Sequence, residues 1–258
     1  MTSYLRMKGI ALFLLLMGPL VKADTLHFAT DAWCPYICDV QSEQPGILVE
    51  ATNQILLSSP YSPNYLTINW AQSINLVRKG ELDGLIGTYQ SDAPDFVYGE
   101  QAFLQSQMCF FVDRNSNWEF TDLSSLNSRT MAFMNGYSYG EVMDTYIAAN
   151  ENQGQNNVMR ISGDEDLQRR IALLNSGRVN TLIEDKRVFA WFIKWAGDAR
   201  QFRAAGCLKA EDVYIGFSPA LEQSARRAAL LDSGLQQLHK NGELSDIIRA
   251  YSPDTFAD

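Results

Sequence analysis

The chain has 258 residues, of which 46% are hydrophobic and 20% charged, and its 30 acidic and 21 basic residues give a formal net charge of −9. This negative surplus argues against nucleic acid as a partner, because nucleic acid is itself strongly negative. The length suffices for two lobes of about 100 residues each, and no internal apolar run approaches the roughly 20 residues of a membrane-spanning helix.

The first 23 residues have the pattern of an export signal. Arg6 and Lys8 precede an apolar run over 10–16, a Gly-Pro pair interrupts it, and Ala23 offers a small residue for cleavage. Cleavage there removes three of the 21 basic residues and none of the 30 acidic ones, so the net charge falls from −9 to about −12. No cysteine stands where a lipid anchor requires one. We therefore expect a freely diffusing, monomeric protein of the periplasm.

The next segments alternate between strand and helix patterns. Residues 25–30 alternate as a strand and end at Asp31, the apolar residues of 47–57 keep helical spacing, and residues 65–70 form a second strand pattern that ends at Trp70. A β-α-β start of this kind is typical of an α/β lobe.

Four cysteines follow the export signal and enter an oxidising compartment, where disulfides are the default expectation. Three pairings are possible. We favour Cys34 with Cys38, which share one short loop, and Cys109 with Cys207, which flank the segments expected to join the lobes. No metal or cofactor is expected, because the two histidines of the chain match no zinc-binding spacing with these thiols.

An internal repeat points to two similar lobes. Residues 76–86 are echoed by residues 173–183. In each copy a helix pattern ends at a glycine, Gly80 or Gly177, and a short apolar strand follows at once. Glycine suits this position because it readily takes the left-handed conformation that closes a helix. The fold class is therefore α/β with two lobes.

The second half of the chain supplies the remaining elements. Residues 130–134 form a strand pattern that leads to a helix from about Glu141, and residues 224–251 are helical with a break at Asn241-Gly242. Residues 109–112 and 213–217 are expected to be strands that cross between the lobes and form a hinge. We divide the chain into a signal peptide (1–23), a first lobe (24–106 and 214–258) and a second lobe (107–213).

Ligands of open α/β sheets bind beyond the carboxyl ends of the strands, where the loops diverge. By position alone, this rule selects aromatic, hydroxyl-bearing and acidic residues. In the first lobe they are Asp31, Trp33, Tyr36, Trp70, Thr88, Tyr89 and Gln90. In the second lobe they are Asn135, Gly136, Tyr137, Ser138, Tyr139, Glu184 and Asp185.

Each class of residue predicts a contact. The N–H groups of the helix start after Gly136, with the Ser138 hydroxyl, would bind an anionic group. Glu184 or Asp185 would pair with an ammonium group, and the aromatic rings would enclose an apolar or cationic body. The alternatives are core packing for the aromatic residues and a solvated, salt-bridged pair for the two acids.

In their order and spacing, these features resemble the family-3 extracellular solute-binding proteins, the polar amino-acid receptors of ABC importers. The resemblance implies a two-lobed periplasmic-binding-protein fold with two hinge crossings and a ligand cleft between the lobes. It also implies that Asp185 binds the α-ammonium group of the ligand and that residues 136–138 receive its carboxylate. The segments that carry it are Pro35-Tyr36, Gly80 to Asp83, Asp122 to Gly136, Ser176 to Asn180 leading to Asp185, and Tyr214 to Phe217.

The chain departs from the family pattern in one segment. Members that bind amino acids usually follow the region of Gly80 to Gly87 with a segment whose arginine clamps the ligand carboxylate, whereas residues 88–95 here contain no arginine. No neutral residue reproduces that bidentate geometry. This absence favours an amine, a polyamine-like or an otherwise modified ligand over an ordinary α-amino acid.

We therefore predict a solute-binding protein, not an enzyme, that captures a small polar ligand for the membrane permease of an ABC importer. One alternative is a protein that reports its ligand to a membrane sensor. Another is a dehydratase-like enzyme on the same fold, with Glu184 as its acid-base group. No Ser-His-Asp or Cys-His arrangement can be assigned from the sequence.

Overall fold

The computed structural model of the chain describes residues 23–152, 157–162, 166–196 and 201–252. The predicted export signal lies outside these residues, except for Ala23. Within the described part of the chain, no helix is both long and apolar enough to cross a membrane.

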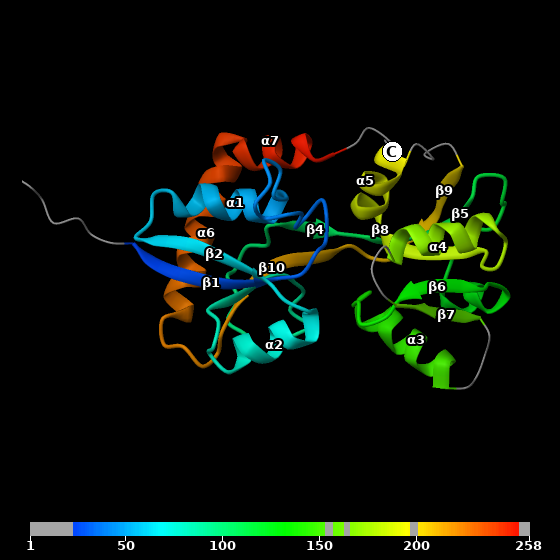
Figure 1. Cartoon of the computed structure of the whole chain (residues 1–258), viewed down its shortest axis with the longest axis horizontal. Helices are drawn as coiled ribbons and strands as arrows, with labels where there is room; N and C mark the ends of the chain where they lie inside the picture. The colour runs from blue at the N-terminus through cyan, green and yellow to red at the C-terminus, as the bar shows by residue number, and fades with distance from the viewer. Residues whose placement is uncertain (1–22, 153–156, 163–165, 197–200, 253–258) are drawn as a thin grey trace, which may run out of the picture.

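The described residues form two lobes, each built on a five-stranded sheet (Figure 1). The first sheet has the order β2-β1-β3-β10-β4, in which β1, β2 and β3 are parallel and β10 is antiparallel to both β3 and β4. Its strands are β1 (Asp24–Thr30), β2 (Tyr61–Thr67), β3 (Gly84–Thr88), β4 (Leu104–Ser106) and β10 (Glu211–Phe217). The helices of this lobe are α1 (Ile47–Leu56), α2 (Trp70–Arg78), α6 (Ser224–Asn241) and α7 (Glu243–Ala250).

The second sheet repeats this topology with the order β7-β6-β8-β5-β9. Strands β6, β7 and β8 are parallel, and β5 is antiparallel to both β8 and β9. The strands are β5 (Met108–Asp113), β6 (Met131–Met134), β7 (Val158–Ile161), β8 (Thr181–Asp185) and β9 (Phe202–Cys207). A 3-10 helix over Leu123–Ser128 precedes β6, and the α-helices are α3 (Glu141–Asn152), α4 (Asp166–Asn175) and α5 (Lys186–Ala196).

Each sheet is covered by helices on both faces, so the central strands β3 and β8 are buried along their whole length. In the first lobe, α1, α6 and α7 pack on one face around Phe28, Leu48 and Leu235, whereas α2 packs on the other around Val77 and Leu85. In the second lobe, α4 and α5 cover one face and α3 the other.

The predicted repeat is confirmed in three dimensions. Helix α2 ends before Gly80 and leads to β3, and helix α4 ends before Gly177 and leads to β8. The two glycines have φ angles of 77° and 71°, which favour glycine over any other residue. Gly242, with a φ of 78°, separates α6 from α7 as expected. Because each repeat ends in the parallel strand next to β1 or β6, both place their following loops at the same edge of their sheet.

The chain crosses between the lobes twice, at Gln107 between β4 and β5 and over 208–210 between β9 and β10. These links are shorter than the crossing strands predicted from the sequence. Residues 109–112 lie inside the second sheet, and all of β10 belongs to the first, since Val213 pairs with Leu104. The chain therefore returns to the first sheet at Glu211, three residues before the predicted boundary at 214.

A second prediction was wrong at Trp70, which was expected to end a strand. Strand β2 ends earlier, at Thr67, and Trp70 begins α2 instead. The physical reason is a helix cap supplied from outside the segment: the Asp31 carboxylate accepts a hydrogen bond from the backbone N–H of Trp70 at 3.1 Å.

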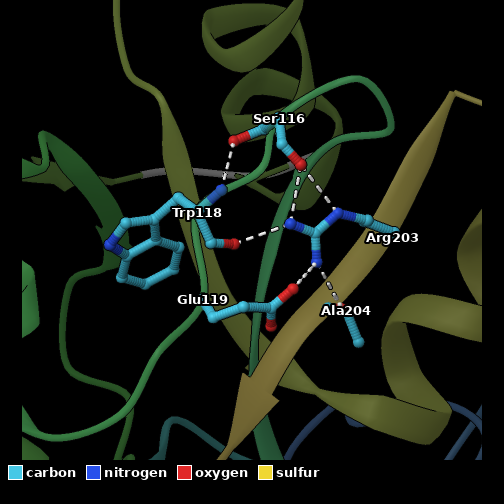
Figure 2. A network of polar contacts seen from close by, with 5 residues as sticks. All are labelled: Ser116, Trp118, Glu119, Arg203 and Ala204. Carbon is cyan, nitrogen blue, oxygen red and sulfur yellow. Dashed lines mark hydrogen bonds and ion pairs between the residues drawn. The ribbon is translucent and has the colours of Figure 1, made fainter.

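Arg203 fixes the loop that follows β5, on the side of the second lobe away from the crossings. Its guanidinium group donates hydrogen bonds to the carbonyl oxygens of Ser116 and Trp118 and forms an ion pair with Glu119 at 2.8 Å (Figure 2). The Arg203 side chain thus satisfies two backbone carbonyl groups of this loop.

All four cysteines are in disulfides, one between Cys34 and Cys38 and one between Cys109 and Cys207. These are the two pairs favoured from the sequence. The first closes the loop after β1, and the second joins neighbouring strands β5 and β9. Their sequence separations of 4 and 98 residues differ widely, so their effects on the unfolded chain differ as well.

Replacing both Cys109 and Cys207 with alanine is expected to destabilise the protein more than replacing both Cys34 and Cys38. In the chain-entropy model, the longer loop contributes about 5 kcal/mol and the shorter one about 2 kcal/mol to the free energy of unfolding. Chemical denaturation of the two double variants measures the difference. Equal losses of stability would show that chain entropy does not set the contribution of the longer bridge.

Candidate binding site between the lobes

A pocket of about 110 Å³ is lined by residues of both lobes. The first lobe contributes the loops after β1 and β3 and the start of α2, and the second contributes the segment between β6 and α3. Its polar and aromatic lining residues are Asp31, Trp33, Asn69, Trp70, Tyr89, Asp92, Asn135, Tyr137 and Ser138.

Two carboxylates line the pocket, and no lysine or arginine is among the lining residues that the structure describes. Asp31 accepts hydrogen bonds from the backbone N–H groups of Ala32 at 2.8 Å and Trp70 at 3.1 Å. Burial raises the pKa of Asp31, and these two N–H groups oppose that shift. The pocket therefore has negative charge without a basic side chain to balance it.

Aromatic side chains form much of the pocket wall. Trp33 stacks on the buried ring of Tyr36, with 4.0 Å between ring centroids, and meets Tyr89 edge to face at 6.4 Å. Among the described residues, Trp33 Nε1 and Tyr137 Oη are buried atoms with no hydrogen-bonding partner. Unpaired buried polar atoms are rare in folded proteins, and both of these belong to residues that line the pocket.

The loop that presents Trp33 is held rigidly. Trp33 and Ile37 exchange backbone hydrogen bonds of 2.8 and 3.0 Å across the Cys34–Cys38 disulfide. Gly46 packs directly beneath this loop with a φ of 107°, and a Cβ atom there would lie 2.6 Å from the carbonyl oxygen of Tyr36. Only glycine fits that position.

The helix start of the second lobe is occupied by the chain's own carboxylates. The backbone N–H of Tyr139 donates to Asp144 Oδ1 at 2.9 Å, and Ser138 Oγ lies 3.0 Å from Asp144 Oδ2. Ser138 Oγ also lies 3.0 Å from Asp92 Oδ1 of the first lobe. The acceptors at this helix start are thus aspartates, where the sequence predicted an anionic group of the ligand.

The contact between Asp92, Ser138 and Asp144 depends on protonation. A serine hydroxyl has one hydrogen, so Ser138 can donate to only one of the two carboxylates at a time. If either aspartate is protonated, it can donate to Ser138 Oγ, and both contacts become hydrogen bonds. Burial raises the pKa of both aspartates, and the negative charge of Asp144 adds to the shift of Asp92.

Glu184 and Asp185, the predicted partners of an ammonium group, do not line this pocket. Glu184 is buried and forms an ion pair of 2.6 Å with buried Arg170, while its other oxygen accepts the backbone N–H of Asp185 at 2.8 Å. Asp185 is fully buried and accepts hydrogen bonds from side chains and backbone of the chain.

The structure thus brings together eight of the predicted residues in this pocket and places the other six outside its lining. Lining the pocket are Asp31, Trp33, Trp70, Tyr89, Asn135, Gly136, Tyr137 and Ser138. Thr88 and Tyr139 are buried, and the Tyr139 hydroxyl accepts the backbone N–H of Met134. Gln90 lies in a wider, neighbouring opening. Tyr36 lies behind Trp33, and Glu184 and Asp185 are buried outside this pocket.

Sequence reasoning missed Asp92. It lies four residues beyond the end of β3, in the loop from which Tyr89 and Gln90 were selected. The signal was present, because the same rule about strand ends applies to the whole loop. Asp92 was not predicted because only the residues directly after the strand were considered.

No family model and no curated protein matches the chain, whereas solved structures match most of it. An ancestral arginine-binding protein bound to arginine has a TM-score of 0.68 and 13% identity, over 89% of this chain and 99% of that one. A histidine kinase sensor domain with similarity to periplasmic binding proteins has a TM-score of 0.70 and 17% identity, over 90% and 99%.

A third match comes from work on glutathione import through GshT and the cystine ABC importer TcyBC of Streptococcus mutans. Its TM-score is 0.71 at 17% identity, over 90% of this chain and 98% of that one. Likeness at such low identity shows the fold. The chain therefore has the two-lobed periplasmic-binding-protein fold, and the resemblance found in the sequence is confirmed at that level.

Replacing Asp144 with asparagine is expected to weaken the pH dependence of stability. Since burial raises the folded-state pKa of Asp92 and Asp144, their protonation stabilises the fold. This stabilisation is complete below the ordinary aspartate pKa of about 4 and is lost as the pH rises through the raised values. Asparagine donates to Ser138 at every pH. The change in unfolding midpoint between acidic and neutral pH should therefore be smaller in D144N.

Thermal unfolding across that pH range measures this effect. Asp246→Asn removes the same charge from an exposed position on α7 and serves as the control. Identical pH profiles for the wild type and D144N would contradict the shared-proton interpretation of the Ser138 contact.

Proposed function

We propose that the chain is an exported solute-binding protein that captures a small organic cation, such as an amine or a polyamine, for the membrane permease of an ABC importer. One observation carries this proposal: Asp31 and Asp92 line a pocket whose wall is aromatic and whose described lining includes no basic side chain. The periplasm is the compartment that fits the predicted export signal and the two disulfides.

The chemistry of the pocket favours a cation over a zwitterion. A carboxylate attracts an ammonium group more strongly in a partly desolvated site than in water, and the faces of Trp33 and Trp70 add cation–π attraction. The carboxylate of an α-amino acid would have to lie near Asp92 and Asp144 at the helix start. Repulsion between like charges opposes that placement.

The unpaired atoms of the wall add a second requirement. Trp33 Nε1 is a donor only, and Tyr137 Oη is both donor and acceptor. Burial raises the pKa of Tyr137 well above its usual value, so its hydroxyl keeps its proton. A ligand that carries a hydrogen-bond acceptor beside its positive charge would satisfy these atoms.

The position of the pocket supports a capture mechanism. Asp31 and Trp33 belong to the first lobe and Tyr137 to the second, so a ligand contacts both only when the lobes are together. Such a ligand has a higher affinity for the closed arrangement and shifts the population toward it. A closed, loaded form is what a membrane partner can distinguish from an empty one.

The comparisons support a binding role over an enzymatic one. The matched structures concern arginine binding, glutathione and cystine import, and a sensor domain. The sensor domain supports a second candidate, in which the loaded protein signals to a membrane sensor. The dehydratase-like alternative is disfavoured, because Glu184, its expected acid-base group, is paired with Arg170 outside the pocket.

A panel of small molecules tests the proposal by thermal shift. It should include putrescine, spermidine, choline, agmatine and arginine, with glutamate, succinate and neutral amino acids as the contrast. A cation present at 100 times its Kd should stabilise the fold by about 2.7 kcal/mol. Stabilisation by acids or neutral amino acids, with no response to any of the amines, would contradict the proposal.

Variants of the two pocket carboxylates test the assigned contacts. Removing one member of a buried charge pair costs about 2–5 kcal/mol, so D31N and D92N should each weaken binding of the best cation by at least about 30-fold. Isothermal titration calorimetry measures the loss. Asp246→Asn removes the same charge far from the pocket and should leave the affinity unchanged, whereas wild-type affinity in both D31N and D92N would refute these contacts.

A further inference from the structure

Asp185 lies at the end of β8, where the second lobe meets the first crossing. Its Oδ1 atom accepts hydrogen bonds from the backbone N–H groups of Arg187 at 2.8 Å and Val188 at 3.0 Å. These two residues form the first turn of α5. Within its own lobe, the Asp185 carboxylate therefore caps a helix.

The same carboxylate also binds the first lobe. Its Oδ2 atom accepts hydrogen bonds from the Ser106 hydroxyl at 2.8 Å and from the backbone N–H of Gln107 at 2.9 Å. The Tyr36 hydroxyl lies 3.0 Å from both carboxylate oxygens. Ser106 ends β4 and Tyr36 belongs to the loop after β1, so one buried charge is satisfied jointly by the two lobes.

This arrangement leaves Asp185 saturated. A carboxylate has about four acceptor sites, and five donors of the chain already approach it. An ammonium group at Asp185 would have to compete with these donors for its acceptor sites. The geometry therefore assigns the carboxylate to contacts within the chain.

Both first-lobe donors touch residues of the pocket. The ring of Tyr36 stacks on Trp33, and the Ser106 hydroxyl lies 2.8 Å from the Tyr89 hydroxyl. Because Ser106 gives its hydrogen to Asp185, Tyr89 is the donor in that second contact. Trp33 and Tyr89 line the pocket, so two short paths connect the pocket to Asp185.

The apolar surface beside Asp185 also joins the lobes. Val188 and Trp191 of α5 pack against the core cluster of the first lobe. The ring of Trp191 lies 5.9 Å from that of Tyr251, at the end of α7. Helix α5 is therefore docked onto the first lobe next to the carboxylate that caps it.

We propose that Asp185 is an inter-lobe positioning residue, which fixes the arrangement of the two lobes through Tyr36 and Ser106 and is coupled to the pocket through Trp33 and Tyr89. We call Asp185, Tyr36 and Ser106 the Asp185 bridge. The proposal does not depend on the identity of the ligand, since every contact in the bridge is made within the chain.

The inter-lobe distance of the ligand-free protein tests the proposal. Gln54 of α1 and Gln168 of α4 are exposed, one in each lobe, and can be replaced by spin-labelled cysteines because the four native cysteines are disulfide-bonded. Pulsed electron paramagnetic resonance then gives the distribution of distances. Tyr36→Phe and Ser106→Ala should each shift this distribution to longer distances and broaden it.

Two matched variants control for loss of a hydroxyl within one lobe. Tyr65→Phe removes a hydrogen bond to Asn53, and Ser73→Ala removes one to the carbonyl of Ile68, both inside the first lobe. These variants are expected to lower the unfolding midpoint without changing the inter-lobe distance. Wild-type distributions in both Y36F and S106A would overturn the proposal.

The link to the pocket has its own test. Tyr89→Phe keeps the aromatic ring in the pocket but removes the hydrogen bond to Ser106, so it should broaden the distribution in the same direction as S106A. An unchanged distribution would overturn the path through Tyr89. Because the measurement needs no ligand, failure to find a bound cation and failure of the Asp185 bridge are distinguishable.

Discussion

Every carboxylate that is buried or half-buried where the two lobes meet must be compensated, and the rest of the structure depends on this constraint. The chain meets it in three ways: Glu184 is paired with Arg170, Asp185 is surrounded by hydroxyl and N–H donors, and Asp92 and Asp144 share the hydroxyl of Ser138. Asp31 has only two backbone donors. Together with Asp92 it lines a pocket with no basic residue in its described lining, and this imbalance is what a cationic ligand would correct.

The repeated topology explains why these groups meet. In each lobe a helix ends at a glycine in the left-handed conformation, and a buried strand follows. The loops that carry the polar residues therefore leave both sheets at equivalent edges. The two short crossings then bring these edges face to face (Figure 1). The Cys34–Cys38 disulfide and the close packing of Gly46 hold the Trp33 loop. The loop is therefore preorganised, which lowers the entropy lost on binding.

Local patterns were enough to predict the fold class, the repeat and the break at Gly242, because each depends on residues close together in the sequence. The strand-end rule likewise found Asp31, Trp33 and Tyr137. It could not show that Glu184 and Asp185 are compensated by the chain itself, since Arg170 must fold back from α4 and Tyr36 comes from 149 residues away. The boundary at 214 could not be predicted from local patterns either, because an apolar strand pattern does not show which of the two sheets the strand joins.

A crystal structure of the protein with its tightest-binding ligand would show which carboxylate binds the positive group. We expect the positive group of that ligand to lie within hydrogen-bonding distance of Asp31 or Asp92, among the rings of Trp33, Trp70, Tyr89 and Tyr137. Asp185 should still accept the hydroxyl groups of Tyr36 and Ser106. A ligand ammonium group bound to Asp185, with Tyr36 displaced from it, would contradict the account.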